Sequence, residues 1–142
     1  MTSQEQYDQL INEHFGYEAT DDVDGVMASL AEQAEHHVVP SPVGILHDKT
    51  QIRAYYEGLF ADIKGESVTP VRRLYGDGFV VDEAIWHGHV VDGRPFLLDG
   101  RSGDVSFRIL HVFEITDGTI SRENVWCDLA AIQQQLAGEG QR

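Results

Sequence analysis

The stretch V-S-F-R-I-L-H-V-F-E-I, from Val105 to Ile115, alternates apolar and polar side chains and decides the fold. A period of two predicts a β-strand with one buried and one solvated face. The odd positions make the buried face: Val105, Phe107, Ile109, His111, Phe113 and Ile115. His111 is therefore the one polar side chain on an otherwise apolar face.

The preceding stretch, residues 81–91 (V-D-E-A-I-W-H-G-H-V-V), is also predicted to be a strand. Its odd positions place Glu83, Ile85, His87 and His89 on one side. Because residues 92–104 join the two strands as a hairpin, we expect the two apolar faces to coincide. The prediction is that His87, His89 and His111 face one space.

Two further strands complete a predicted four-strand meander that starts near Val68. Turn signals stand at residues 76–78 (G-D-G), 92–93 (D-G) and 117–118 (D-G). In the last strand, residues 119–127, periodicity does not decide which parity faces inward, because Ile120 and Trp126 oppose Val125 and Cys127. Glu123 and Asn124 therefore remain alternatives for the inward position.

The first half of the chain shows helical spacing. The first helix places His14 on an inward stripe with Tyr7, Leu10, Ile11 and Glu18. A second helix is predicted from Val23, after capping residues 20–22, to about His36, and a third spans the apolar positions of residues 52–63, Tyr55 and Tyr56 among them. A short helix follows Asp128. Helices followed by a meander predict an α+β fold.

The length and net charge of the chain limit the number of domains and the kinds of partner that we expect. A chain of 142 residues fits one domain, 1–142. Ten basic against 24 acidic residues give a net charge of −14, which disfavours nucleic acids and anionic membranes as partners. No stretch approaches a membrane span, and the polar start with a single cysteine predicts a cytoplasmic protein without a disulfide.

The histidines carry the strongest chemical signal. A buried imidazole needs polar partners, so three of them on adjacent strands, with His14 on a covering helix, favour a functional cavity over simple core packing. The H-x-H pair at 87–89 with His111 also resembles a zinc geometry, with Glu83 or Glu123 as a further ligand. His36, His37 and His47 lie at predicted element ends, where solvated surface is expected. No cofactor-binding motif is present, and no cofactor is predicted.

Several short motifs point to a known family: D-V-D-G-V at 22–26, P-S-P-V-G at 40–44, I-R-A-Y-Y at 52–56 and D-G-T-I at 117–120. The chain resembles the nuclear transport factor 2-like superfamily, and within it the ketosteroid isomerases and SnoaL-like polyketide cyclases. The resemblance implies a single SnoaL-like domain. It implies a cone-shaped curved antiparallel sheet wrapped around a pocket and closed by three N-terminal helices, in a homodimer formed through the outer sheet face.

Site residues can be carried over from the ketosteroid isomerases one by one. The carboxylate base of that family falls on Ser41, and its oxyanion-binding tyrosine falls on His14. The supporting tyrosine falls on Tyr56, and the protonated aspartate falls on His111. The missing carboxylates disfavour steroid isomerisation by that mechanism.

The polyketide cyclases match at His111, but their catalytic aspartate falls on Val125. This alignment implies that Glu123, Val125 and Cys127 face inward, with Glu123 as a displaced carboxylate.

The sequence thus leads to an enzyme of cyclase, isomerase or dehydratase (lyase) type in secondary metabolism. It would move protons on an apolar carbonyl-bearing, polyketide- or polycycle-like substrate. The expected catalytic residues are His14, His87, His89, His111 and Glu123. The expected substrate-binding residues are Ser41, Tyr55, Tyr56, Ile85, Phe107, Ile109, Phe113 and Val125. The alternatives are a non-catalytic binding protein for an apolar ligand and a metal-dependent enzyme using His87, His89 and His111.

Overall fold

The computed structural model describes residues 1–137, in which it places four α-helices and six β-strands. In chain order the elements are α1 (Ser3–Ala19), α2 (Val23–Ser29), β1 (Leu30–Val39), β2 (Ile45–Leu46), α3 (Lys49–Asp62), β3 (Ile63–Gly76), β4 (Phe79–Val90), a 3₁₀ turn (Arg94–Phe96), β5 (Gly103–Thr116), β6 (Thr119–Cys127) and α4 (Leu129–Ala137). The predicted α+β class is confirmed. Residues 138–142 of the predicted domain lie outside the described part. Within that part, no helix is long and apolar enough to cross a membrane.

Each of the first three helices begins at a side chain that caps its free backbone N–H groups. The Thr2 hydroxyl accepts from the Glu5 amide at 3.1 Å, and the Asp22 carboxylate accepts from the Gly25 amide at 3.0 Å. Asp48 accepts from the Thr50 amide at 2.6 Å. Such caps stabilise a helix by roughly 0.5–2 kcal/mol, so local sequence sets where these helices start.

The strands form one sheet in the order β2-β1-β6-β5-β4-β3. The β1–β6 ladder is parallel, and the other four ladders are antiparallel. β3 to β6 are the predicted meander, with β3 starting at Ile63 rather than Val68. The hairpin turns use Gly78 and Gly118 at φ 79° and 76°, a backbone region that favours glycine.

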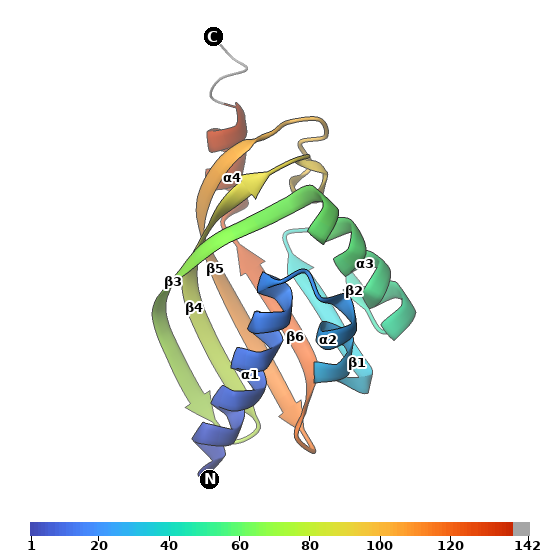
Figure 1. The fold of residues 1–142 in the computed structure, drawn as a ribbon, viewed down its shortest axis with the longest axis vertical. Helices are drawn as coiled ribbons and strands as arrows, with labels where there is room; N and C mark the ends of the chain where they lie inside the picture. Colours follow the sequence, from blue (N-terminus) through green and yellow to red (C-terminus); the bar gives the residue numbers. More distant parts are fainter. Residues whose placement is uncertain (138–142) are drawn as a thin grey trace.

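Helices α1, α2 and α3 cover one face of the curved sheet (Figure 1). Their apolar sides meet the sheet in a core that includes Ile11, Val26, Ile52, Val80 and Phe113. Burial of side chains of this size stabilises the fold by roughly 1.5–3 kcal/mol each. A second cluster joins α4 to the other end of the sheet and contains Val90, Phe96, Val105, Phe107, Ile132 and Leu136.

The predicted end of the second helix is wrong. The second helix ends at Ser29 instead of continuing to about His36, and β1 takes over at Leu30. Residues 30–36 (L-A-E-Q-A-E-H) are mostly good helix formers, so local propensity favours a longer helix. Pairing with β6 overrides that preference, because the strand buries Leu30, Ala34 and His36 against the helices.

Candidate active site

A cavity of about 390 Å³ lies between the helices and the concave face of the sheet. This volume falls in the range of small-molecule sites, roughly 300–1,000 Å³. Its apolar walls are formed by Phe15, Val38, Tyr55, Leu59, Phe60, Ile63, Val68, Ala84, Trp86, Phe96, Phe107, Ile109, Val125 and Cys127. Burial raises the pKa of the Cys127 thiol to about 11, so this cysteine is a neutral wall residue rather than a nucleophile.

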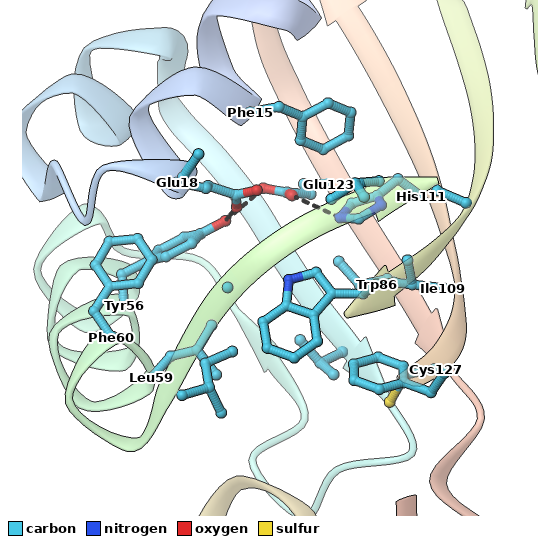
Figure 2. A pocket seen from close by; sticks show the side chains of 18 of the residues that line it. Phe15, Glu18, Tyr56, Leu59, Phe60, Trp86, Ile109, His111, Glu123 and Cys127 are labelled. Carbon is cyan, nitrogen blue, oxygen red and sulfur yellow. Dashed lines mark hydrogen bonds and ion pairs between the residues drawn. The ribbon is translucent and has the colours of Figure 1, made fainter. Parts of the chain in front are cut away.

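Polar side chains from five elements meet at one side of this cavity. They are Glu18 of α1, His36 of β1, Tyr56 of α3, His111 of β5 and Glu123 of β6. Figure 2 shows Glu18, Tyr56, Glu123 and His111 pointing toward one another, with Trp86, Ile109 and Cys127 around the apolar remainder. Together with His14 directly behind, these five residues are called the polar cluster below.

His14 is a buried imidazolium. The Ser29 hydroxyl donates its one proton to the Val26 carbonyl at 2.6 Å, so it must accept from His14 Nδ1, which lies 2.7 Å away. The other nitrogen, Nε2, lies 3.2 Å from Glu123 Oε2. Both nitrogens therefore donate. Burial alone would lower the pKa of His14, but the carboxylates of Glu123 and Glu18 raise it to about 10.

Glu123 is the centre of the polar cluster, and the residue is 0% exposed. Its Oε1 accepts from the Tyr56 hydroxyl at 2.9 Å and lies 3.7 Å from His36 Nε2. His111 Nε2 lies 3.7 Å from Oε2. Burial opposes ionisation, but His14, His36 and His111 outweigh it and hold the pKa of Glu123 well below its usual range. Glu123 is a carboxylate.

The charge on His14 predicts a pH dependence of stability. In the unfolded chain the pKa of histidine is about 6.5, and in the fold it is about 10. The stabilisation from this raised pKa is full below pH 6.5, declines as the pH rises, and is lost once the pH passes about 10. Imidazole ¹⁵N shifts will follow His14, and urea unfolding from pH 6 to pH 10 will follow stability. Loss of the His14 proton near pH 7 in the folded protein would contradict the assignment.

Glu18 is the acidic member of the polar cluster with the most access to the cavity, with its side chain 24% exposed. Its Oε2 lies 2.8 Å from the Tyr56 hydroxyl and 3.4 Å from His14 Nε2. His111 also faces the cavity, and its Nδ1 is buried without a hydrogen-bond partner within residues 1–137. A ligand in the cavity would therefore meet a carboxyl group and an imidazole.

The structure brings together many of the residues selected from sequence. Tyr55, Tyr56, Phe107, Ile109, His111, Glu123 and Val125 line the cavity. His14 lies behind Glu123 and contacts it from the core. The inward parity implied by the family resemblance is thus observed, with Glu123, Val125 and Cys127 all at the cavity.

The prediction that His87 and His89 share a face with His111 is wrong. The register pairs His111 with Asp82, Ile109 with Ala84 and Phe107 with Trp86, so the even positions of β4 face the cavity. His87 bonds instead to Thr69 and Ser106 at 2.8 Å each, and His89 bonds to Asp104 at 2.8 Å. A one-residue change of register moves every side chain to the other face.

The same register shows that two other residues of β4 do not face the cavity as predicted from the sequence. Ile85 lies opposite Arg108, on the face of β4 that points away from the cavity. Glu83 lies on that face too and binds Arg108 at 2.7 Å. The predicted metal site of His87, His89 and His111 is therefore not formed, because its residues lie on opposite sides of the sheet.

Two further predicted binding residues lie elsewhere. Phe113 belongs to the sealed core, where its ring packs edge-on against those of His14 and Phe15. Ser41 lies in the turn between β1 and β2, where its hydroxyl accepts from the Val43 amide at 3.2 Å. Neither residue lines the cavity.

Sequence reasoning missed several polar and aromatic lining residues, among them His36, Trp86 and Glu18. His36, 2% exposed, was expected at a solvated helix end. Alternation of Ala34, His36 and Val38 would have indicated an inward-facing strand. Trp86 was assigned to the outer face by the register error, and Glu18 stood on the inward helix stripe without being given a role.

Within residues 1–137, one group of ligand atoms could hold a metal ion. Atoms of His14, Glu18 and Glu123 lie within 4.8 Å of one another. In the observed arrangement protons occupy both nitrogens of His14, so a metal would have to displace one of them. The geometry as it stands is that of a hydrogen-bonded acid–base cluster.

Comparison with known proteins identifies the family to which this chain belongs. The SnoaL-like domain model matches residues 11–123, and the chain belongs to the SnoaL-like domain family. The confirmed architecture is that of the nuclear transport factor 2-like proteins. No curated protein matches the sequence.

Solved structures share the fold at low sequence identity. An isomerase candidate from Bacillus subtilis matches with a TM-score of 0.80 and 19% identity, covering 97% of each chain. A candidate SnoaL-like polyketide cyclase from Shewanella putrefaciens CN-32 has a TM-score of 0.78 and 14% identity, covering 97% of this chain and 99% of that one. An LEH-like epoxide hydrolase from M. tuberculosis has a TM-score of 0.71 and 16% identity, covering 94% of this chain and 90% of that one.

Proposed function

We propose that the protein is a small-molecule enzyme that moves protons on an apolar, carbonyl-bearing substrate of polyketide or polycyclic type. Cyclisation, isomerisation and dehydration all belong to this chemistry. The observation that carries the proposal is the polar cluster, which places ionised and ionisable groups at one side of an aromatic and aliphatic cavity. Perturbed acid–base groups in an apolar pocket favour catalysis over simple binding.

The cavity supplies what proton transfer to or from carbon requires. Apolar walls exclude water, so hydrogen bonds and charges act in a medium of low dielectric constant. Glu18 is placed to exchange a proton with the ligand, because it faces the cavity and is held by Tyr56. His111 also lines the cavity and would donate to an enolate oxygen. Tyr55 and Trp86 would orient an apolar ring between them.

The charge of the cavity predicts which ligands bind. Among residues 1–137, the lining set contains the carboxylates of Glu18, Asp21, Glu66, Asp82 and Glu123 but no lysine or arginine. An anionic ligand would therefore lose its hydration without gaining a cationic partner. We expect a neutral polycyclic ketone to bind at least about tenfold more tightly than the same skeleton carrying a carboxylate, a difference of about 1.4 kcal/mol.

Isothermal titration calorimetry with such a matched pair tests the proposed substrate class. Tighter binding of the neutral ketone supports the proposed substrate class. The ketone should also compete with a ligand whose binding in the cavity is followed by ¹H–¹⁵N NMR. Equal or tighter binding of the carboxylate would contradict it. A native mass spectrum of freshly isolated protein complements the titration, because mass above the 15.9 kDa chain or its multiples would reveal a retained organic ligand or metal.

A further inference from the structure

The indole ring of Trp86 lies over a position where two neighbouring strands carry no side chains. Gly88 of β4 pairs with Gly65 of β3. A methyl group at Gly88 would overlap the six-membered ring of the indole, and one at Gly65 would lie 3.4 Å from its Cζ2. Phe107, opposite Trp86 on β5, packs against it with ring centroids 5.3 Å apart. The two glycines thus make room for the indole, and both neighbouring strands confine it.

This placement turns the indole nitrogen toward the polar cluster. In Figure 2 the nitrogen lies on the edge of the ring that faces Glu18, Glu123 and His111. The backbone of Trp86 is distant from these residues, because its partner Phe107 stands four positions from His111 along β5, about 13 Å of strand. The residues at both ends of this distance line the cavity. The N–H group is therefore directed across the cavity at the acid–base groups.

The Trp86 N–H has no hydrogen-bond acceptor within residues 1–137. None of the hydrogen bonds drawn among the cavity residues in Figure 2 reaches it. An indole N–H can only donate, and buried ones usually find a partner. A donor left unpaired in apolar surroundings costs free energy. A ligand that fills this cavity is therefore expected to present an acceptor to the indole.

We propose that Trp86 Nε1–H donates a hydrogen bond to the carbonyl oxygen of the substrate and stabilises the charge that develops there during proton transfer. This role rests on the proposed function. It narrows the substrate class to molecules whose carbonyl oxygen points at the indole while the neighbouring carbon points at Glu18. A neutral donor that keeps its proton suits an enolate oxygen, because a fixed dipole in an apolar site stabilises the charge without any further proton transfer.

The step balances within the site. The Glu18 carboxylate removes a proton from the carbon next to the carbonyl group, and the C–H electron pair forms the double bond of the enolate. The negative charge moves to the oxygen, where the Trp86 N–H donates to it and keeps its own proton. Glu18 then returns the proton to the same carbon, or to another carbon of the conjugated system in an isomerisation. The protein ends unchanged.

Binding of the saturated ketone 2-decalone tests the hydrogen bond without turnover. The chain has two tryptophans, so its ¹H–¹⁵N spectrum contains two indole signals, which Trp126→Phe assigns. We expect the Trp86 indole proton to move downfield as 2-decalone is added, because it gains an acceptor. Trp126, which does not line the cavity, should keep its position. No downfield movement of the Trp86 signal at the highest soluble ketone concentration overturns the proposal.

Replacement of Trp86 by 3-benzothienylalanine tests the catalytic role. This analogue keeps the shape of the indole and carries sulfur in place of the N–H, so the packing against Gly88 and Phe107 is preserved. We expect hydrogen–deuterium exchange of 2-decalone in D₂O to slow by about 10²–10³-fold, the usual effect of losing one oxyanion donor. The Kd of the ketone should rise by about tenfold or less. The same replacement at Trp126 is the matched control and should retain the wild-type rate.

The results separate this proposal from the proposed function. If the wild-type protein accelerates exchange and the Trp86 analogue retains more than about a tenth of that rate, the proposal is overturned and the proposed function stands. If the Trp86 signal moves but wild-type exchange stays at the buffer rate, the enzymatic function is overturned. The catalytic role of Trp86 is overturned with it, and only its contact with the bound ketone is upheld.

Discussion

Glu123→Ala is expected to lower the free energy of unfolding by about 3–5 kcal/mol, the cost of removing one partner of a buried ion pair. The His14 imidazolium, 0% exposed, would lose its closest carboxylate, and the Tyr56 hydroxyl would lose one acceptor. Urea unfolding at pH 7 measures the change. A loss below about 1 kcal/mol, the range of exposed pairs, would show that the pair does not hold the helices to the sheet.

Two further variants show how much of the loss of stability comes from breaking the buried ion pair. Glu32→Gln removes an exposed partner, 93% exposed and 3.8 Å from Lys49, and should change stability by less than about 1 kcal/mol. The double variant His14→Leu, Glu123→Leu removes both partners of the ion pair, so neither is left buried without its partner. It should be less destabilised than Glu123→Ala, because apolar replacement of both partners is often close to neutral.

Glu18→Gln is expected to reduce the rate of proton transfer by about 10²–10⁴-fold, the usual contribution of a general acid–base group. The amide keeps the size of the side chain but cannot accept and return a proton. The matched control is Glu13→Gln on the same helix, where the exposed carboxylate accepts a hydrogen bond from Gln9 at 3.3 Å. This variant should retain the wild-type rate.

The readout is the exchange of hydrogen for deuterium at the carbon next to a bound ketone, followed by mass spectrometry in D₂O. Binding affinity is measured in parallel, so that a loss of rate is separated from a loss of ligand. Retention of more than about a tenth of the wild-type rate in Glu18→Gln would remove Glu18 from the proposed chemistry.

Much of the architecture follows from local pattern. The alternation in residues 105–115 predicts β5, and the glycine turns predict the meander. Helix caps at Asp22 and Asp48 fix where α2 and α3 begin. These features depend on neighbours in sequence, and for that reason they can be recognised from sequence.

The errors arise where distant pairing decides. β4 carries apolar residues on both faces, with Val81 and Ile85 outward and Val80 and Ala84 inward, so alternation could not set its register. His87 and His89 were assigned to the wrong face for this reason. β1 contains helix-forming residues and becomes a strand through its ladders with β6 and β2. Because this pairing is distant in sequence, the inward position of His36 was not predicted.

The site itself could be predicted in part. His111 stood out as a polar residue on an apolar strand face, and His14 on an apolar helix stripe. Glu123 lies next to both histidines, but its inward orientation was predicted only from the family resemblance. Periodicity alone left Glu123 and Asn124 as alternatives for the inward position. The role of Glu18 could not be read from sequence, since it depends on the place of this side chain at the cavity and on its contact with Tyr56 of another helix.

Deuterium incorporation by the wild-type protein tests the central claim most directly, namely that the cavity and its polar cluster form an acid–base active site. A neutral polycyclic ketone that binds in the cavity is incubated with the protein in D₂O at pH 7. The account predicts exchange at the carbon next to the carbonyl, faster than in buffer and abolished by a competing cavity ligand. Exchange at the buffer rate by ketones that demonstrably occupy the cavity would contradict it and identify a binding protein.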